Sequence, residues 1–218
     1  MNLTKTLKII SAVAALTAAG SAQAGFVYYD TASPTGSTSI SVPSINDFRS
    51  QLSSVGVSNY RLGRSLGLSG LGANAEINVD FFAAEAAYRN QFRLGATTVV
   101  DNTGNRNWAE RDYGNFNVTN GRMDFRFCAV TINQCVTNSQ NDSTSASSAR
   151  SIGMWISADG NTAWLLWDDS GAGPDDNHDD MVVRLTIRSV PEPGTLALLG
   201  VGLVGMGLIR RKRLATKL

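Results

Sequence analysis

The densest group of potential ligand side chains lies at residues 168–180, where six aspartates occur within thirteen residues. Calcium suits such a group because it takes roughly six to eight oxygen ligands in flexible geometry. Asp175, Asn177 and Asp179 have the D-x-N-x-D spacing, which lets alternate side chains converge on one ion. The predicted calcium ligands are Asp168, Asp169, Asp175, Asp176, Asn177, Asp179 and Asp180.

This segment does not follow the EF-hand pattern. Its sixth position is Asp180 instead of glycine, and its twelfth is Thr186 instead of glutamate. A solvated acidic loop that only keeps the protein soluble is the alternative interpretation. The single histidine, His178, is a poor zinc candidate among hard oxygen ligands, and we expect it to be exposed.

The acidic loop lies between two predicted strands, residues 162–167 and 181–188, which must position it. Residues 181–188 alternate between apolar and other side chains, and residues 152–157 and 162–167 predict a hairpin closed by an Asp-Gly turn. A Trp-rich strand, an acidic loop and a Val-Val strand in this order resemble the acidic loop of calcium-associated β-sandwich domains in exported bacterial proteins. Trp155, Trp164 and Trp167 could form a sugar-stacking platform, although we favour core and hairpin packing for them.

The rest of the central region also indicates short strands. Residues 75–82 alternate, whereas residues 83–91 include the helix-forming run Ala-Ala-Glu-Ala-Ala between flanks that favour a sheet. This stretch resembles a segment of exported bacterial β-sandwich proteins, which makes Glu85 and Asn90 weak site candidates. Residues 44–52 predict one helix, with Ser44 and Asp47 at capping-box spacing. The predicted fold is therefore all-β, a single jelly-roll-like β-sandwich with one short helix.

The charge of the central region indicates which partners it can bind, and its cysteine content indicates whether it contains a disulfide. Residues 25–189 carry twelve arginines, no lysine and seventeen acidic residues, a net charge of −5 that argues against a nucleic-acid partner. Cys128 and Cys135 are the only cysteines, and in an oxidising compartment we expect them to form a disulfide, with two free buried thiols as the alternative.

The first 24 residues have the pattern of a signal peptide. Lys5 and Lys8 precede an apolar stretch at residues 9–19, which predicts a signal helix. Ala22 and Ala24 supply the small residues that a signal peptidase needs, so cleavage is expected before Gly25.

Residues 190–218 form a second targeting segment. Pro191, Glu192 and Pro193 precede an uncharged apolar run at residues 195–209, and a basic cluster follows: Arg210, Arg211, Lys212 and Arg213. As a helix the run would be about 22 Å long, shorter than a hydrocarbon core of about 30 Å, and basic side chains could help it to span. A buried core helix is the alternative.

This order of parts resembles the PEP-CTERM sorting tail of exported bacterial proteins. The resemblance implies recognition by an exosortase, processing near Pro191–Pro193 after transient anchoring in the inner membrane, and delivery to the cell surface or extracellular matrix of a Gram-negative bacterium. The predicted domains are residues 1–24, 25–189 and 190–218.

We expect the central domain to be a non-enzymatic structural or interaction protein, with calcium as its candidate cofactor. One alternative is a calcium-dependent carbohydrate-binding module for exopolysaccharide, and a less favoured one is a glycoside hydrolase.

Overall fold

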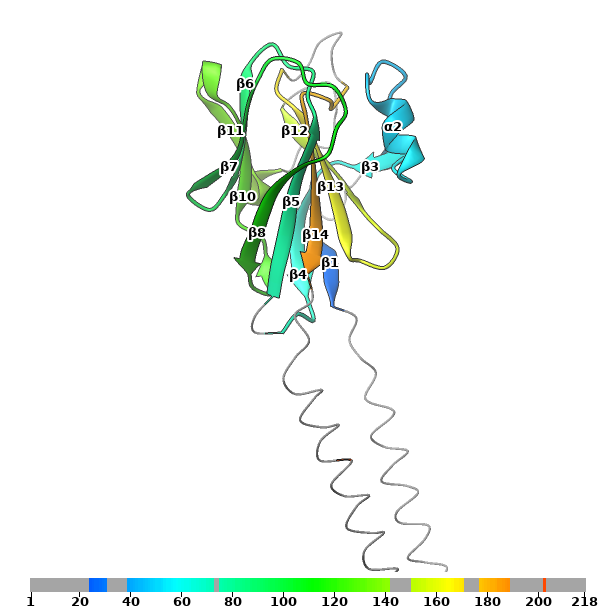
Figure 1. Cartoon of the computed structure of the whole chain (residues 1–218), viewed down its shortest axis with the longest axis vertical. Coiled ribbons are helices and arrows are strands. Elements are labelled where there is room, and N and C mark those ends of the chain that lie inside the picture. Colours follow the sequence, from blue (N-terminus) through cyan, green and yellow to red (C-terminus); the bar gives the residue numbers. More distant parts are fainter. Residues whose placement is uncertain are drawn as a thin grey trace, which may run out of the picture.

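The computed structural model describes residues 24–30, 39–72, 75–141, 150–170 and 177–188, together with Gly202. Their strands form two facing layers with one short helix at the side, so the predicted all-β sandwich-like domain is confirmed (Figure 1). The predicted signal helix and membrane-anchor helix lie outside these residues. Among the residues that are described, no helix is long and apolar enough to cross a membrane.

The larger layer is a seven-stranded antiparallel sheet in the order β2-β3-β12-β13-β14-β5-β8. Its strands are β2 (Ser39–Ser41), β3 (Asn59–Arg61), β5 (Ala75–Ala83), β8 (Arg111–Val118), β12 (Ser151–Ile156), β13 (Thr162–Asp168) and β14 (Met181–Arg188). The predicted hairpin is confirmed as β12 and β13, and Gly160 in its turn has a φ of 71°. β14, the last strand in sequence, lies inside the sheet between β13 and β5.

The second layer consists of two smaller sheets, in the orders β1-β4-β9 and β11-β10-β6-β7. Their strands are β1 (Gly25–Asp30), β4 (Arg64–Ser69), β6 (Arg89–Leu94), β7 (Thr97–Thr103), β9 (Gly121–Arg122), β10 (Phe125–Ala129) and β11 (Gln134–Thr137). Short 3-10 turns follow β10 at Val130–Ile132 and β11 at Asn138–Gln140. β5 ends at Ala83 and β6 begins at Arg89, so the alanine-rich stretch forms no helix, and the prediction of sheet is confirmed only at its two ends. Ala84 forms an isolated bridge with Arg106, and residues 85–88 connect the strands.

Three asparagine side chains take the place of a neighbouring strand. Asn138 accepts from the Leu66 N–H and donates to the carbonyls of Leu66 and Met123, each at 2.7 Å. Asn141 holds Ile152 through the same two-bond contact, and the exposed Asn120 holds the half-buried Leu71 in the same way. An amide side chain carries one acceptor and two donor hydrogens, so it can reproduce the pairing of an antiparallel strand. Asn138 therefore joins β4 to the chain that enters β10.

The main core lies between the layers. Ile77, Val79 and Phe81 of β5 face inward, as the alternation predicted, and they meet Phe92 and Phe127 from the other layer. A second apolar cluster lies on the outer face of the large sheet, where Phe48 and Leu52 cover Tyr60, Phe82 and Leu166.

The helix that supplies this cover, α2 (Arg49–Ser54), begins later than predicted. Phe48 is its N-cap residue, and no side-chain cap hydrogen bond is present, so the predicted capping box of Ser44 and Asp47 is wrong. The reason is tertiary, because the backbone N–H of Asp47 donates to the Asp179 carboxylate at 2.8 Å.

Cys128 and Cys135 form a disulfide, as predicted. They are directly opposite each other in the β10–β11 pair, so the bond ties two neighbouring strands together.

Candidate functional site

Three carboxylates from distant parts of the chain meet beside α2. One oxygen each of Asp47, Glu85 and Asp179 lies within 4.8 Å of the other two. Asp47 is exposed, Glu85 is half-buried and Asp179 is buried. Like charges at this spacing repel unless a cation or protons offset them, and such a set of oxygens suits a hard cation such as calcium.

The pairing of β5 with β14 and three long-range hydrogen bonds explain why these groups meet. Glu85 follows the end of β5, and Asp179 lies directly before the start of its neighbour β14. The Glu85 N–H donates to the Asp179 carbonyl at 2.9 Å, while the Asp47 N–H holds the Asp179 side chain. The Asn46 amide also donates to the carbonyl of Asn177 at 2.8 Å. The turn before α2 is thus fastened to the segment that enters β14.

The structure places the predicted calcium ligands in different environments. Asp168, Asp169, Asn177, Asp179 and Asp180 are all buried, so this part of the segment is not a solvated loop. Asp175 and Asp176 lie outside the described residues. Of the predicted ligands, Asp179 belongs to the carboxylate cluster, where Glu85 was only a weak candidate. Asp47 was missed as a ligand, because nothing in its sequence neighbourhood connects it to a residue 132 positions away.

Asp169 lies at the centre of a separate buried polar network. Its carboxylate accepts from the Asn90 amide, whose oxygen in turn accepts from the Trp167 indole N–H at 3.2 Å. Asp180 accepts from the Asp169 N–H at 2.7 Å. Burial, together with the negative charge of Asp169, raises the pKa of Asp180 to about 9. Asn90, the other weak site candidate, is therefore part of the interior of the sandwich.

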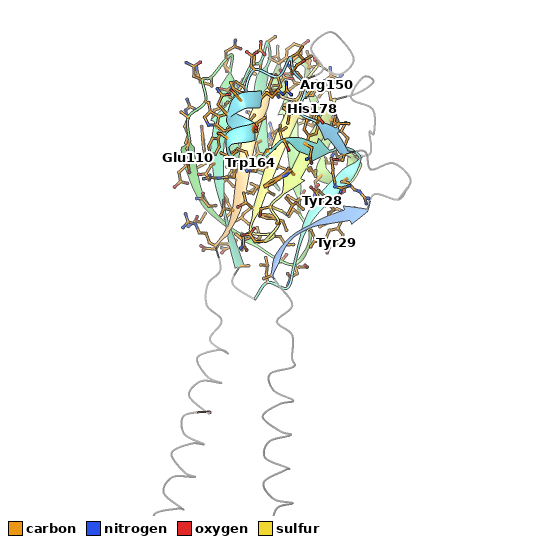
Figure 2. All side chains as sticks on the ribbon, turned by 90° about the vertical axis from the view of Figure 1, so that its right-hand side faces the viewer. Tyr28, Tyr29, Glu110, Arg150, Trp164 and His178 are labelled. Atoms are coloured by element: carbon orange, nitrogen blue, oxygen red, sulfur yellow. A yellow bond between two sulfur atoms is a disulfide. The ribbon has the colours of Figure 1, made fainter. Side chains whose placement is uncertain are left out.

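His178 is fully buried, so the prediction that it is exposed is wrong. Its Nε2 lies 2.8 Å from the Ser151 hydroxyl and its Nδ1 lies 3.1 Å from the Tyr60 hydroxyl, which gives both ring nitrogens a partner inside the protein. Burial lowers the pKa of His178 to about 3, so the ring is neutral at pH 7. Figure 2 shows it towards the end of the sandwich that carries Arg150, away from Tyr29.

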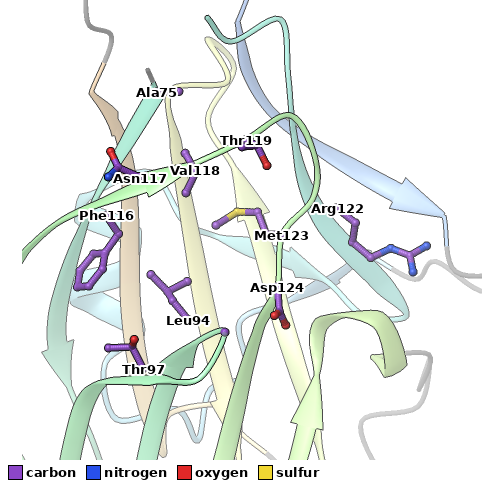
Figure 3. A pocket seen from close by; sticks show the side chains of 11 residues that line it. Ala75, Leu94, Thr97, Phe116, Asn117, Val118, Thr119, Arg122, Met123 and Asp124 are labelled. Carbon is purple, nitrogen blue, oxygen red and sulfur yellow. The ribbon is translucent and has the colours of Figure 1, made fainter. Parts of the chain in front are cut away.

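A cleft of about 600 Å³ lies at the Ala75 end of β5, away from the end that Glu85 follows. It opens between β5 and β8 of the large sheet and the β6–β7 turn and β9–β10 segment of the second layer (Figure 3). Its lining residues are Ala75, Leu94, Gly95, Thr97, Phe116, Asn117, Val118, Thr119, Arg122, Met123 and Asp124. The sequence contains no motif for this cleft, because its walls come from five separate strands and the turns beside them.

The tryptophan side chains mainly pack against other side chains of the domain, which is the interpretation that the sequence favoured. Trp167 lies in the core, and Trp155 is half-buried. Trp164 is only 2% exposed, because Trp108 stacks on it with ring centres 5.8 Å apart and Phe82 lies against it at 4.7 Å. The face of Trp164 is therefore not available as a sugar platform.

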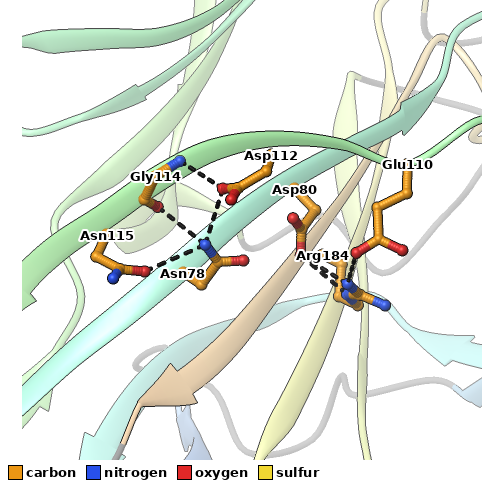
Figure 4. A network of polar contacts seen from close by, with 7 residues as sticks. All are labelled: Asn78, Asp80, Glu110, Asp112, Gly114, Asn115 and Arg184. Carbon is orange, nitrogen blue, oxygen red and sulfur yellow. Dashed lines mark hydrogen bonds and ion pairs between the residues drawn. The ribbon is translucent and has the colours of Figure 1, made fainter.

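Arg184 lies over the rings of Phe82 and Trp164. The guanidinium of Arg184 lies 4.8 Å from the ring centre of Phe82 and pairs with the carboxylates of Asp80 and Glu110 (Figure 4). Burial raises the pKa of Asp80, and the hydrogen bond from Arg184 opposes that shift. Beside this group, the Asn78 amide donates to Asp112 at 2.9 Å. These polar groups bind one another across three strands.

The two predicted targeting segments adjoin the domain directly in the sequence. β1 begins at Gly25, the residue that follows the predicted cleavage site, and β14 ends at Arg188. Both strand ends lie at the same end of the sandwich (Figure 1). The predicted sorting residues, from Pro191 to Arg213, lie outside the described part of the chain.

Comparison with known proteins identifies one part of this chain. No curated protein matches it. Residues 189–213 match the family model described as PEP-CTERM protein-sorting motif. The predicted sorting tail is thereby confirmed, and the chain is an exported protein with a membrane-anchored C-terminal sorting signal that an exosortase processes.

Proposed function

We propose that the exported domain is a non-enzymatic surface or matrix protein whose fold is stabilised by calcium. The observation that supports calcium is the meeting of Asp47, Glu85 and Asp179 from three distant segments. A cation there would bridge the turn before α2 and the adjoining ends of β5 and β14. The remaining oxygens of a coordination shell of roughly six to eight would come from water and nearby carbonyl groups.

Two features of the structure support a role without catalysis. The Ser151–His178 pair has the residue types of a nucleophile and its base, but both side chains are fully buried and His178 is bonded on both nitrogens. The cleft has one carboxylate among its lining residues, Asp124, whereas glycosidases generally use a pair. The glycoside hydrolase alternative therefore finds no carboxylate pair among the residues that line this cleft.

The exopolysaccharide alternative needs a different location from the one first considered. An exposed groove with Trp155 or Trp164 beside the acidic segment would have favoured it, but Trp164 is covered by Trp108 and Trp155 is half-buried. The face of Trp164 therefore gives this alternative no support. Exosortase and signal peptidase remain the processing partners that we propose, with the cell surface or extracellular matrix of a Gram-negative bacterium as the destination.

Thermal unfolding of the chain in chelator, then across a calcium titration, tests the calcium proposal. Calcium at a hundredfold excess over its dissociation constant should add about 2.7 kcal/mol and raise the midpoint by about 5–10 °C. Asp47→Asn and Glu85→Gln should abolish this rise, while Glu76→Gln at the far end of β5 should keep it. Magnesium is the control ion. The absence of any shift at millimolar calcium would refute the proposal.

A further inference from the structure

The floor of the 600 Å³ cleft is an end of the sandwich core that remains open to solvent. Ala75 and Met123 belong to the core, and Leu94, Phe116 and Val118 pack against it while staying partly exposed. Figure 3 shows Leu94, Val118 and Met123 converging inside the cleft. Ligand pockets combine apolar walls with a few polar groups, so this floor suits a ligand with an apolar face.

Polar side chains surround that floor. Within the described part of the chain, no hydrogen bond or ion pair engages the side chains of Thr97, Asn117, Thr119, Arg122 and Asp124. Part of the backbone beside them is already used, because Gly95 N–H donates to the Asp124 carbonyl and Ala75 pairs with Val118. A ligand in this cleft is therefore met mainly by side-chain hydroxyl, amide and charged groups.

These properties select among ligand classes. An extended peptide that adds to a sheet binds through backbone groups of an edge strand, and β7, β8 and β9 beside this cleft are edge strands, so peptide binding is the alternative that the experiment below distinguishes. A pyranose ring has an apolar face and a perimeter of hydroxyls, which matches an aromatic side chain surrounded by polar ones. The rim carries one Arg and one Asp, and the domain is acidic overall, so a polyanionic chain is disfavoured.

We propose that the cleft binds a short segment of a neutral oligosaccharide, with one ring on Phe116 and its hydroxyls within reach of Thr97 and Asp124. Its volume falls within the range of about 300–1,000 Å³ that is usual for ligand pockets. The proposal depends on the proposed extracellular location for access to sugars, but not on calcium. Ala75 begins β5 and Glu85 follows its end, so the length of a nine-residue strand, about 30 Å, separates the cleft from the carboxylate cluster.

Isothermal titration of the full chain with cellotetraose and with maltotetraose tests this proposal. A zwitterionic detergent keeps the targeting segments in solution, because sugar-based detergents would compete. Saturable binding of either sugar is expected, at least about tenfold weaker for Phe116→Ala and for Asp124→Asn. Tyr113→Ala removes an exposed aromatic side chain from the same strand outside the cleft, and it should leave the affinity unchanged. Since Phe116 also packs against the core, Asp124→Asn is decisive if Phe116→Ala does not fold.

Each outcome has a distinct meaning. Binding that persists in chelator, and that the cleft variants alone weaken, supports the proposal even if calcium has no effect on thermal unfolding. No saturation by either sugar at about 10 mM overturns it, as does equal binding by Asp124→Asn and Tyr113→Ala. Binding of a peptide spanning residues 189–195, without binding of sugars, would instead make the cleft a docking site for the sorting tail.

Discussion

Replacing Asn138 by alanine should destabilise the domain by about 3 kcal/mol. The side chain is 1% exposed and satisfies the Leu66 N–H and the Met123 carbonyl. Leu66 O would keep its bond from the Met123 N–H, so two backbone groups lose their partner. Each buried group left without a partner costs about 1–3 kcal/mol, which gives about 2–6 kcal/mol in total.

Urea denaturation measures this cost, with an unchanged slope showing that the unfolded state is the same. Asn120→Ala is the matched control, because Asn120 makes the same two-bond contact with Leu71 at an exposed position. Water can replace that contact, so its loss should cost less than about 1 kcal/mol. Equal costs for the two variants would refute the argument that burial, not the hydrogen bonds alone, sets the magnitude.

Asn138→Asp provides a second test of the same reasoning. Burial and the two facing carbonyls would raise the pKa of the new carboxyl in the folded state. A raised pKa means that its contribution to stability is complete below its ordinary pKa of about 4 and is lost as the pH rises through the folded value. The variant should therefore be closer to the wild type at about pH 4 than at about pH 8, and a constant difference would contradict this.

Three further changes test other parts of the fold. Replacing both cysteines by serine should lower the free energy of unfolding by about 2–3 kcal/mol, checked by urea denaturation, and a loss below about 0.5 kcal/mol would contradict the loop-closure estimate. Gly153→Ala should cost at least about 2 kcal/mol, because a Cβ there would lie 2.5 Å from the buried Tyr60 ring; an unchanged urea midpoint would show that the ring can move. The partly exposed Arg89–Asp101 pair lowers the pKa of Asp101, so its stabilisation is present above the ordinary pKa of Asp101 and lost as the pH falls through the lowered value. Asp101→Asn should therefore cost less than about 1 kcal/mol at pH 7 and nothing in acid, when melting is compared at the two pH values.

Local patterns in the sequence were sufficient to predict several of the strands that border the main core. Alternation identified β5 and β14, and the Asp-Gly turn identified the β12–β13 hairpin, because a strand with one face against the core repeats every two residues. The alanine-rich stretch at the end of β5 shows the limit of propensity, since its backbone N–H groups donate to distant residues instead of forming a helix.

The environment of the acidic segment could not be inferred locally. His178 was expected in solvent because its neighbours are acidic, yet Ser151 and Tyr60 are fixed beside it by strands that are distant in sequence. The capping box failed for the same reason, since Asp47 contacts Asp179 across the fold. Neither partner is visible in a window of the sequence, and the open cleft has no sequence signature at all.

The position of β14 has a consequence for when this protein can fold. It is the last strand to leave the ribosome or a translocation channel, yet both of its edges are paired, with β13 and with β5 about a hundred residues earlier. The large sheet cannot close until that strand arrives, because the pairings that complete it are non-local. The large sheet is therefore complete only after β14 has been made, and the sorting motif begins at the residue that follows this strand.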